Sequence, residues 1–269
     1  LKRKILYLAD RNILVDQSIQ QDFAPLEKVI HKINVAKDDP STITSHEVET
    51  NGPAMFGDFG ESPCYHLNFY SPIPDQTDYV CPNPGYAWGN ARAIADTQPH
   101  YKGDYQRIYS VEGQNEMIAE ARAKGYLVSY NHPNWSKQSY PDYIGLEGIT
   151  ALEVYNTGCA IGGWTLDESD HVLDEFLMAG KRVYPVATDD NHGEHDMCGG
   201  WVRFKAESLT YENIFNAYAK GDFYASMGPE IYELYTDEEN GERTVTIRTS
   251  PAVGIYCSTA TRRRYHKLM

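Results

Sequence analysis

The sequence lacks a long hydrophobic run, and it has little positive charge and little cysteine. No apolar stretch approaches the roughly 20 residues that a membrane-spanning helix needs. The 24 Lys and Arg residues are outnumbered by 38 Asp and Glu residues, which gives a formal net charge of -14 at pH 7. A surface of this sign repels phosphate backbones and anionic lipids. We therefore expect a small-molecule partner, no nucleic acid duplex and no membrane, and the oligomeric state stays open.

The five cysteines are odd in number and widely spaced. This pattern favours reduced thiols over a disulfide framework, and together with the absence of a secretion signal it predicts a cytoplasmic protein. The chain opens on an apolar run at residues 5–9 with no cap or leader before it, which predicts that its first strand is missing. Its 269 residues, 41% of them hydrophobic, suffice for a complete core.

Strands that end in polar residues are the main pattern of the sequence. Residues 126–130 form an apolar and aromatic run that leads directly into Asn131, His132 and Pro133. Proline ends a strand, so His132 is expected at its carboxyl end. Taken alone, His132 fits a locally hydrogen-bonded histidine as well as a functional one.

The same pattern recurs twice downstream. A run at 149–155 leads into Asn156, and a run at 183–187 leads into Asp190 and His192. Helical spacing of apolar residues is found at 17–34, 111–124, 167–179 and 210–220. Strands that alternate with helices predict a parallel sheet, whose carboxyl ends form one pocket.

Two further β-rich runs, 43–50 and 65–70, contain Glu47 and His66. We expect His46 and Glu49, which lie close to Glu47, to be solvated. Residues 71–109 are irregular, and both an active-site cover and a surface excursion stay open for them.

The sequence pattern changes after residue 229, from alternating strands and helices to β-rich runs. Runs at 231–235, 244–249 and 254–258 predict a hairpin and a further strand. We expect a main domain at 1–229 and the start of a small β-rich appendage at 230–269.

Several short motifs follow one another in a fixed order. They are ADRN at 9–12, the β-run with Glu47, YHLNFY with His66, YNHPNW with His132, LEVYN at 152–156, TDDNH with Asp190 and His192, and the stretch 208–229. This set resembles the PHP (polymerase and histidinol phosphatase) superfamily of metal-dependent phosphoesterases, nearest the branch that also contains carbamate hydrolases. The resemblance covers about 5–231 and implies a distorted (β/α)7, TIM-like barrel with zinc, manganese or iron at its strand ends.

The resemblance also implies roles for individual residues. Glu47 would bridge metal ions, His66 and His132 would be the imidazoles of one site, and Asp190 and His192 would serve further sites. Asn156 would orient a ligand and is assigned to catalysis. Asn131 is assigned to substrate binding. Imidazole and carboxylate suit such metals, which lower the pKa of bound water.

The sequence departs from the family at two points. No H-x-H motif occurs anywhere in the chain, and Asp10 is followed by Arg11, where the family has histidine. We assign Arg11 to catalysis and substrate binding, because a guanidinium can bind phosphate with its planar fork. The alternative that Arg11 forms an ion pair with an acidic side chain stays open.

These observations predict a metal-dependent hydrolase that cleaves a small-molecule or nucleotide phosphoester with metal-activated water. Hydrolysis of a carbamate or other ester at the same site is a related alternative. A degenerate domain that binds a metal or an anion without catalysis is another, favoured by the missing H-x-H. A separate zinc cluster of His192, His195 and Cys198 also stays open, although a fourth ligand is not evident.

Overall fold

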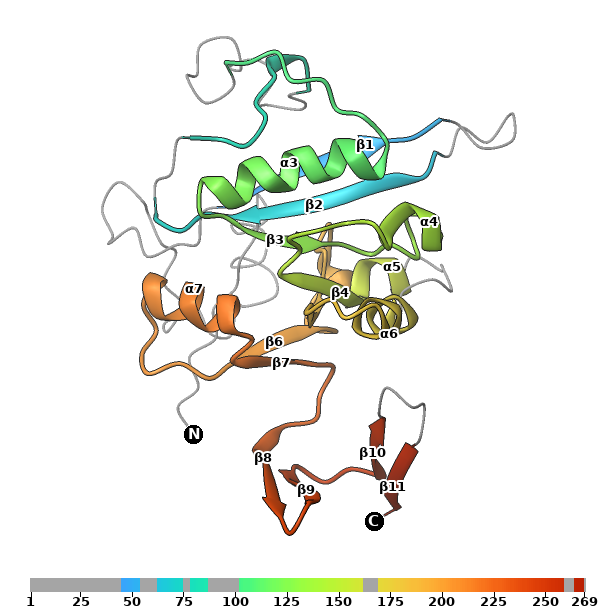
Figure 1. Ribbon diagram of the computed structural model, residues 1–269, viewed down its shortest axis with the longest axis vertical. Helices are drawn as coiled ribbons and strands as arrows, with labels where there is room; N and C mark the ends of the chain where they lie inside the picture. The colour runs from blue at the N-terminus through green and yellow to red at the C-terminus, as the bar shows by residue number, and fades with distance from the viewer. Residues whose placement is uncertain are drawn as a thin grey trace.

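The computed structural model describes residues 45–53, 62–74, 78–86, 102–161, 169–258 and 264–268 (Figure 1). The expected strand at 5–9, the expected helix at 17–34 and Arg11 lie outside the described residues. The helices are α3 (Val111–Ala123), α4 (Tyr140–Tyr143), α5 (Thr157–Ile161), α6 (Asp170–Met178) and α7 (Tyr211–Lys220), with short 3-10 helices η3 (Pro84–Tyr86) and η6 (Glu194–Asp196). The strands are β1 (Ser45–Asn51), β2 (Cys64–Tyr70), β3 (Leu127–Tyr130), β4 (Ala151–Asn156), β5 (Tyr184–Thr188), β6 (Trp201–Phe204), β7 (Phe223–Ser226), β8 (Ile231–Glu239), β9 (Glu242–Thr249), β10 (Gly254–Ser258) and β11 (Arg264–Leu268).

The central element is an open sheet of five strands in the order β1-β2-β3-β4-β5. The β3, β4 and β5 strands are parallel, as expected, but β2 is antiparallel to both β1 and β3. The expected (β/α)7 barrel is therefore wrong: no closed barrel occurs among the described residues. A (β/α) barrel needs parallel neighbours throughout and a sheet that closes on itself. Here β1 and β2 break the parallel order, and β1 does not pair with β5.

The alternation of side chains along each strand gives the sheet two different faces. On one face, Leu67 and Phe69 of β2 and Val128 of β3 are buried with Met117 and Ile118 of α3 in the main core. Figure 1 shows α3 lying along β1 and β2. The opposite face presents the alternate residues. Leu127, Ala151 and Val186 on this face pack under α7, whereas Glu47, His66 and Glu153 make its remaining part polar. We call this part the polar face, and the candidate site is built on it.

The expected helix at 111–124 is confirmed as α3. The Ser110 side chain accepts a hydrogen bond from the Gly113 N–H at its start, and Gly125 follows its end with a φ of 85°. The expected helix at 210–220 is confirmed as α7, capped by Thr210 and ended by Gly221 in the left-handed conformation. A second, smaller core joins α7 to β3, β4 and β5, and β6 and β7 pair beside it.

The described parts of the irregular stretch 71–109 pack along α3. Tyr126 donates a hydrogen bond to the Asp78 carbonyl, and Lys124 forms an ion pair with Asp78 at 2.9 Å. Val80 and Cys81 are buried in the main core. These contacts attach the stretch to the helix-covered side of the sheet.

The β-rich end of the chain forms two hairpins, β8–β9 and β10–β11. Figure 1 shows them beyond β7, apart from the central sheet. The division into 1–229 and 230–269 stays a prediction. In the described part of the chain, no helix is long and apolar enough to cross a membrane. All five cysteines are described, and none is in a disulfide.

Candidate functional site

A chain of close side-chain contacts runs across the polar face of the sheet. The Glu47 Oε1 atom of β1 lies 2.9 Å from His66 Nε2 of β2. The other ring nitrogen of His66, Nδ1, lies 2.6 Å from His132 Nε2, just beyond the end of β3. His132 Nδ1 in turn lies 3.0 Å from the Ser136 hydroxyl. The sequence prediction that Glu47, His66 and His132 lie together is therefore supported by their positions.

The two imidazoles have opposite pKa shifts. Burial disfavours a charge on His66, but the adjacent Glu47 carboxylate outweighs it, so the pKa of His66 is raised. Burial and the neighbouring His66 hold the pKa of His132 well below its usual range. A proton shared by the pair therefore belongs to His66, and His132 is a neutral imidazole, the form that binds metals.

Glu153 of β4 organises the buried side of this cluster. Its carboxylate accepts hydrogen bonds from the His132 backbone N–H at 2.9 Å, from the Asn156 amide at 3.0 Å and from the Thr188 hydroxyl. Burial is the main cause that raises the pKa of Glu153 to about 7, and the negative charge of Asp190 adds to it. Sequence reasoning missed this residue, although an acid between Leu152 and Val154 in an apolar strand was a signal.

Asn156 links Glu153 to Asp190. Its amide nitrogen also donates to Asp190 Oδ2 at 3.1 Å, and its oxygen accepts from the Cys159 backbone N–H at 2.9 Å. The side chain is completely buried, so each of these bonds fixes its orientation. This arrangement agrees with the expectation that Asn156 orients a neighbouring ligand.

Two of the candidate ligands have unusual backbone conformations. His132 has a φ of 27° and Asp190 a φ of 46°. Such conformations are strained for residues other than glycine, and His132 also precedes a proline, which restricts it further. Backbone strain of this kind is concentrated at functional sites.

The remaining predicted site residues are His192, Asn131 and Arg11. His192 is exposed, and its Nδ1 lies 2.7 Å from the Asp190 backbone oxygen. Asn131 is buried, and its side-chain oxygen accepts a hydrogen bond from the Ser129 hydroxyl at 3.0 Å. Arg11 is outside the described residues.

The alternative zinc cluster gains no support. His195 lies beside Asp196, with 3.2 Å between Nε2 and Oδ1, and Cys198 is exposed. In the segments that the structure describes, no three of these or other His, Cys, Asp or Glu side chains form a group that could hold an ion.

The expectation that His46 is solvated is wrong. Its ring lies among those of Phe69, Tyr79 and Tyr126, at centroid distances of 5.0, 4.9 and 5.4 Å. Strand alternation explains this, since His46 and Glu47 point to opposite faces and the His46 face is the core. Glu49 is exposed, as expected.

The donor chemistry of the cluster fits a divalent metal, because imidazole nitrogen and carboxylate oxygen are the ligands that zinc, manganese and iron take. The buried His66 Nε2 also makes no hydrogen bond of good geometry. The rings of His66 and His132 would have to move apart to bind one ion, since each zinc–nitrogen bond is about 2.1 Å long. The donor atoms of these side chains are therefore suitable metal ligands, but the side chains are not arranged around a common point where an ion could bind.

The fold and this cluster define an α/β protein with two buried histidines and neighbouring carboxylates on the polar face of an open sheet. No protein-family model matches the chain, and no curated protein matches it. The resemblance to the PHP superfamily stays a prediction from the motifs.

Proposed function

We propose that the protein is a metal-dependent hydrolase that cleaves a small-molecule or nucleotide phosphoester, and that it works in the cytoplasm. One observation supports this most strongly. Glu47, His66 and His132 come from separate elements and meet in a chain of contacts of 2.9 and 2.6 Å on the polar face of the sheet. Two further acids, Glu153 and Asp190, adjoin them through one shared amide.

Glu47, His66, His132 and Asp190 are the residues that would hold the ion. A bound divalent ion supplies a Lewis acid and lowers the pKa of water towards neutrality. The chain itself supplies oriented ligands, of which His132 is a neutral imidazole. Burial keeps His132 neutral by lowering its pKa, and the Ser136 hydroxyl at 3.0 Å fixes its ring.

Glu153 and Asn156 act as positioning residues. Glu153 holds the His132 backbone N–H, and Asn156 holds the Asp190 carboxylate at 3.1 Å. Partners of this kind orient ligands and affect metal affinity by about 10–100-fold. We propose this indirect role for Asn156 in place of contact with the substrate.

Elemental mass spectrometry tests the proposal directly. Untagged protein should contain zinc, manganese or iron at one or more ions per chain, and a Glu47→Ala, His132→Ala double variant should lose it. His171→Ala is the matched control, because His171 is an exposed histidine on α6 and should leave the metal content unchanged. The parent should then hydrolyse para-nitrophenyl phosphate.

Absence of metal after reloading with all three ions would overturn the proposal. Faster turnover of a para-nitrophenyl carbamate than of the phosphate would instead favour the related esterase activity.

A second candidate function is anion or metal binding without catalysis. The absence of an H-x-H motif from the chain favours it, because the resembling family takes two ligands of one metal ion from that motif. Metal that binds to the parent without hydrolysis of either ester would support this candidate.

A further inference from the structure

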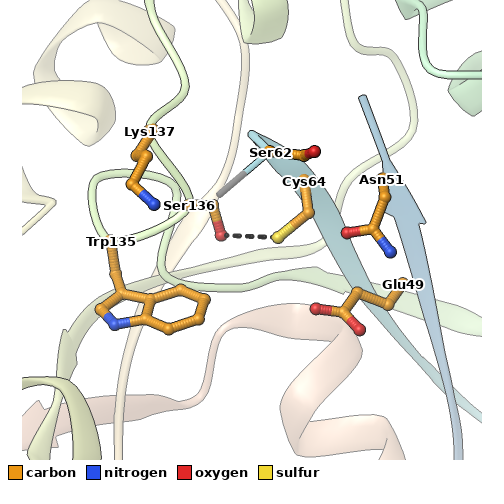
Figure 2. Close-up of a pocket in the computed structure, with 7 residues that line it drawn as sticks. All are labelled: Glu49, Asn51, Ser62, Cys64, Trp135, Ser136 and Lys137. Carbon is orange, nitrogen blue, oxygen red and sulfur yellow. Dashed lines mark hydrogen bonds between the residues drawn. The ribbon is translucent and has the colours of Figure 1, made fainter. Parts of the chain in front are cut away.

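A small cavity lies beside the cluster, on the same face of the sheet. Its volume is about 190 Å³. Figure 2 shows its lining: Glu49 and Asn51 come from β1, Ser62 precedes β2, Cys64 begins β2, and residues 135–137 come from the loop after β3. Glu49 lies two residues from Glu47, and Cys64 two residues from His66, so strand alternation puts cavity and cluster on one surface.

The cavity and the cluster share a wall. The Ser136 hydroxyl accepts a hydrogen bond from Cys64 Sγ at 3.4 Å and lies 3.0 Å from His132 Nδ1. The Trp135 ring meets the His132 ring edge to face, with the centroids 5.1 Å apart. A molecule in the cavity would therefore be separated from His132 by a single side chain.

The size of the cavity limits what it can hold. An apolar cavity of about 150 Å³ accommodates benzene, whereas pockets for drug-sized ligands usually span about 300–1,000 Å³. A single ring fits a volume of about 190 Å³, and a nucleoside does not.

The lining favours a planar group. The indole of Trp135 offers an aromatic partner. The interaction energy of an aromatic pair exceeds what the buried area alone provides. Glu49 and Lys137 line the same cavity as the indole, and Figure 2 draws them on different sides of it. These groups can hydrogen-bond to substituents on the rim of a ring.

We propose that this cavity binds a small aromatic ring of the substrate, so that the protein prefers aryl esters to alkyl esters and to nucleotides. The inference rests on the proposed hydrolase function, whose substrate class it narrows. Trp135 is the residue that recognises the ring.

Calorimetric titration with two phosphonates that differ only in the organic group tests the inference. The parent protein, with the metal it contains when purified, should bind phenylphosphonate at least tenfold more tightly than methylphosphonate. Trp135→Leu should reduce this ratio below threefold. Trp135→Phe, which keeps a ring, should preserve most of the ratio.

Trp201→Leu is the matched control, since it removes an indole from β6, away from the cavity lining, and should keep the tenfold ratio. Circular dichroism checks that each variant is folded. Equal binding of both phosphonates by the parent, no binding of phenylphosphonate, or a ratio that survives in folded Trp135→Leu would overturn the inference.

The outcomes separate this inference from the proposed function. A parent that hydrolyses methyl phosphate but binds both phosphonates equally is a hydrolase without a ring-binding cavity. A parent that binds phenylphosphonate through Trp135 but holds no metal and hydrolyses no ester has the cavity and lacks the proposed activity.

Discussion

At the scale of single residues, strand alternation decides which side chains reach the site. Glu47, His66 and Glu153 occupy positions on the polar face, and their immediate neighbours belong to the core. The sequence predicted the first two, because histidine and glutamate stood in recognisable motifs. It missed Glu153, because the contacts that identify it come from His132, Asn156 and Thr188, two of which are distant in sequence. A buried acidic residue indicates a functional site only once its hydrogen-bond partners are known.

His46 is the residue for which we predict a pH-dependent stability. Burial, with smaller effects of Lys124 and Arg107, lowers its pKa to about 4. Folding lowers the pKa of His46 from about 6.5, so the unfolded chain takes up a proton at a higher pH than the folded protein does. The free energy of unfolding is therefore highest above pH 6.5 and decreases as the pH falls towards 4. The contribution lost by pH 4 amounts to about 3 kcal/mol, since one pKa unit corresponds to about 1.4 kcal/mol.

His46→Phe should remove this dependence, because phenylalanine fills the same aromatic site and cannot be protonated. Urea unfolding at several pH values should show the variant gaining about 3 kcal/mol over the parent between pH 7 and pH 4. His171→Gln, at an exposed site on α6, should follow the parent. If His46→Phe also follows the parent across this range, the buried environment of His46 is wrong.

At the scale of elements, the local signals were reliable. The spacing of apolar residues predicted the bounds of α3 and α7 to within a residue. The strand at 126–130 and the pairs of β-rich runs also occur where expected. Strand direction was less predictable. The parallel pairing of β3, β4 and β5 follows from helices between them, whereas the antiparallel pairing of β1 and β2 has no marker within either strand.

Gly221, which ends α7, is predicted to tolerate no side chain. Its φ is +75°, and a Cβ atom would lie 2.2 Å from the Tyr184 ring. Gly221→Ala should lower the free energy of unfolding by about 1 kcal/mol because of the left-handed conformation, and by about 1–3 kcal/mol more because of overpacking against Tyr184. Each kcal/mol lowers Tm by about 2–4 °C in proteins of this size, which a thermal melt measures.

Gly180 is the matched control for this substitution. It follows α6 with a φ of +78°, but among the described residues no atom beyond its two chain neighbours lies within 4 Å of the position that an added Cβ atom would take. Gly180→Ala should therefore cost only the conformational part, about 1 kcal/mol. Equal losses of Tm for the two variants would contradict the close packing of α7 against Tyr184.

At the scale of the whole molecule, the hydrophobic periodicity of the sequence did not determine whether the sheet is open or closed. Alternating helices and strands are compatible with an open sheet as well as with a barrel, and closure depends on pairing between the first and last strands. That pairing joins residues far apart in sequence and leaves no local signal. The expected barrel was therefore an inference from resemblance, and the order β1 to β5 in the described residues corrects it.

The two ends of the described chain should differ strongly in local stability. The β8 strand is exposed at every residue after Ile231, and β9 is mostly exposed, whereas β2 is buried at five of its seven residues. An isolated two-stranded hairpin is marginally stable in water, and regions with few buried contacts open with little free energy. We therefore predict rapid hydrogen exchange in β8 and β9.

Hydrogen–deuterium exchange with mass spectrometry measures this difference within one sample. Peptides covering 231–249 should exchange within minutes at pH 7, and peptides covering β2 and β3 should stay protected for hours. The β1–β2 pair is the internal control, because it is also an antiparallel pair of neighbouring strands. Equal protection of β8–β9 and β1–β2 would mean that other contacts cover the hairpin, including its exposed Leu234 and Val245. The proposed division after residue 229 would then be wrong, since a hairpin held that firmly belongs to the cooperative unit of the central sheet.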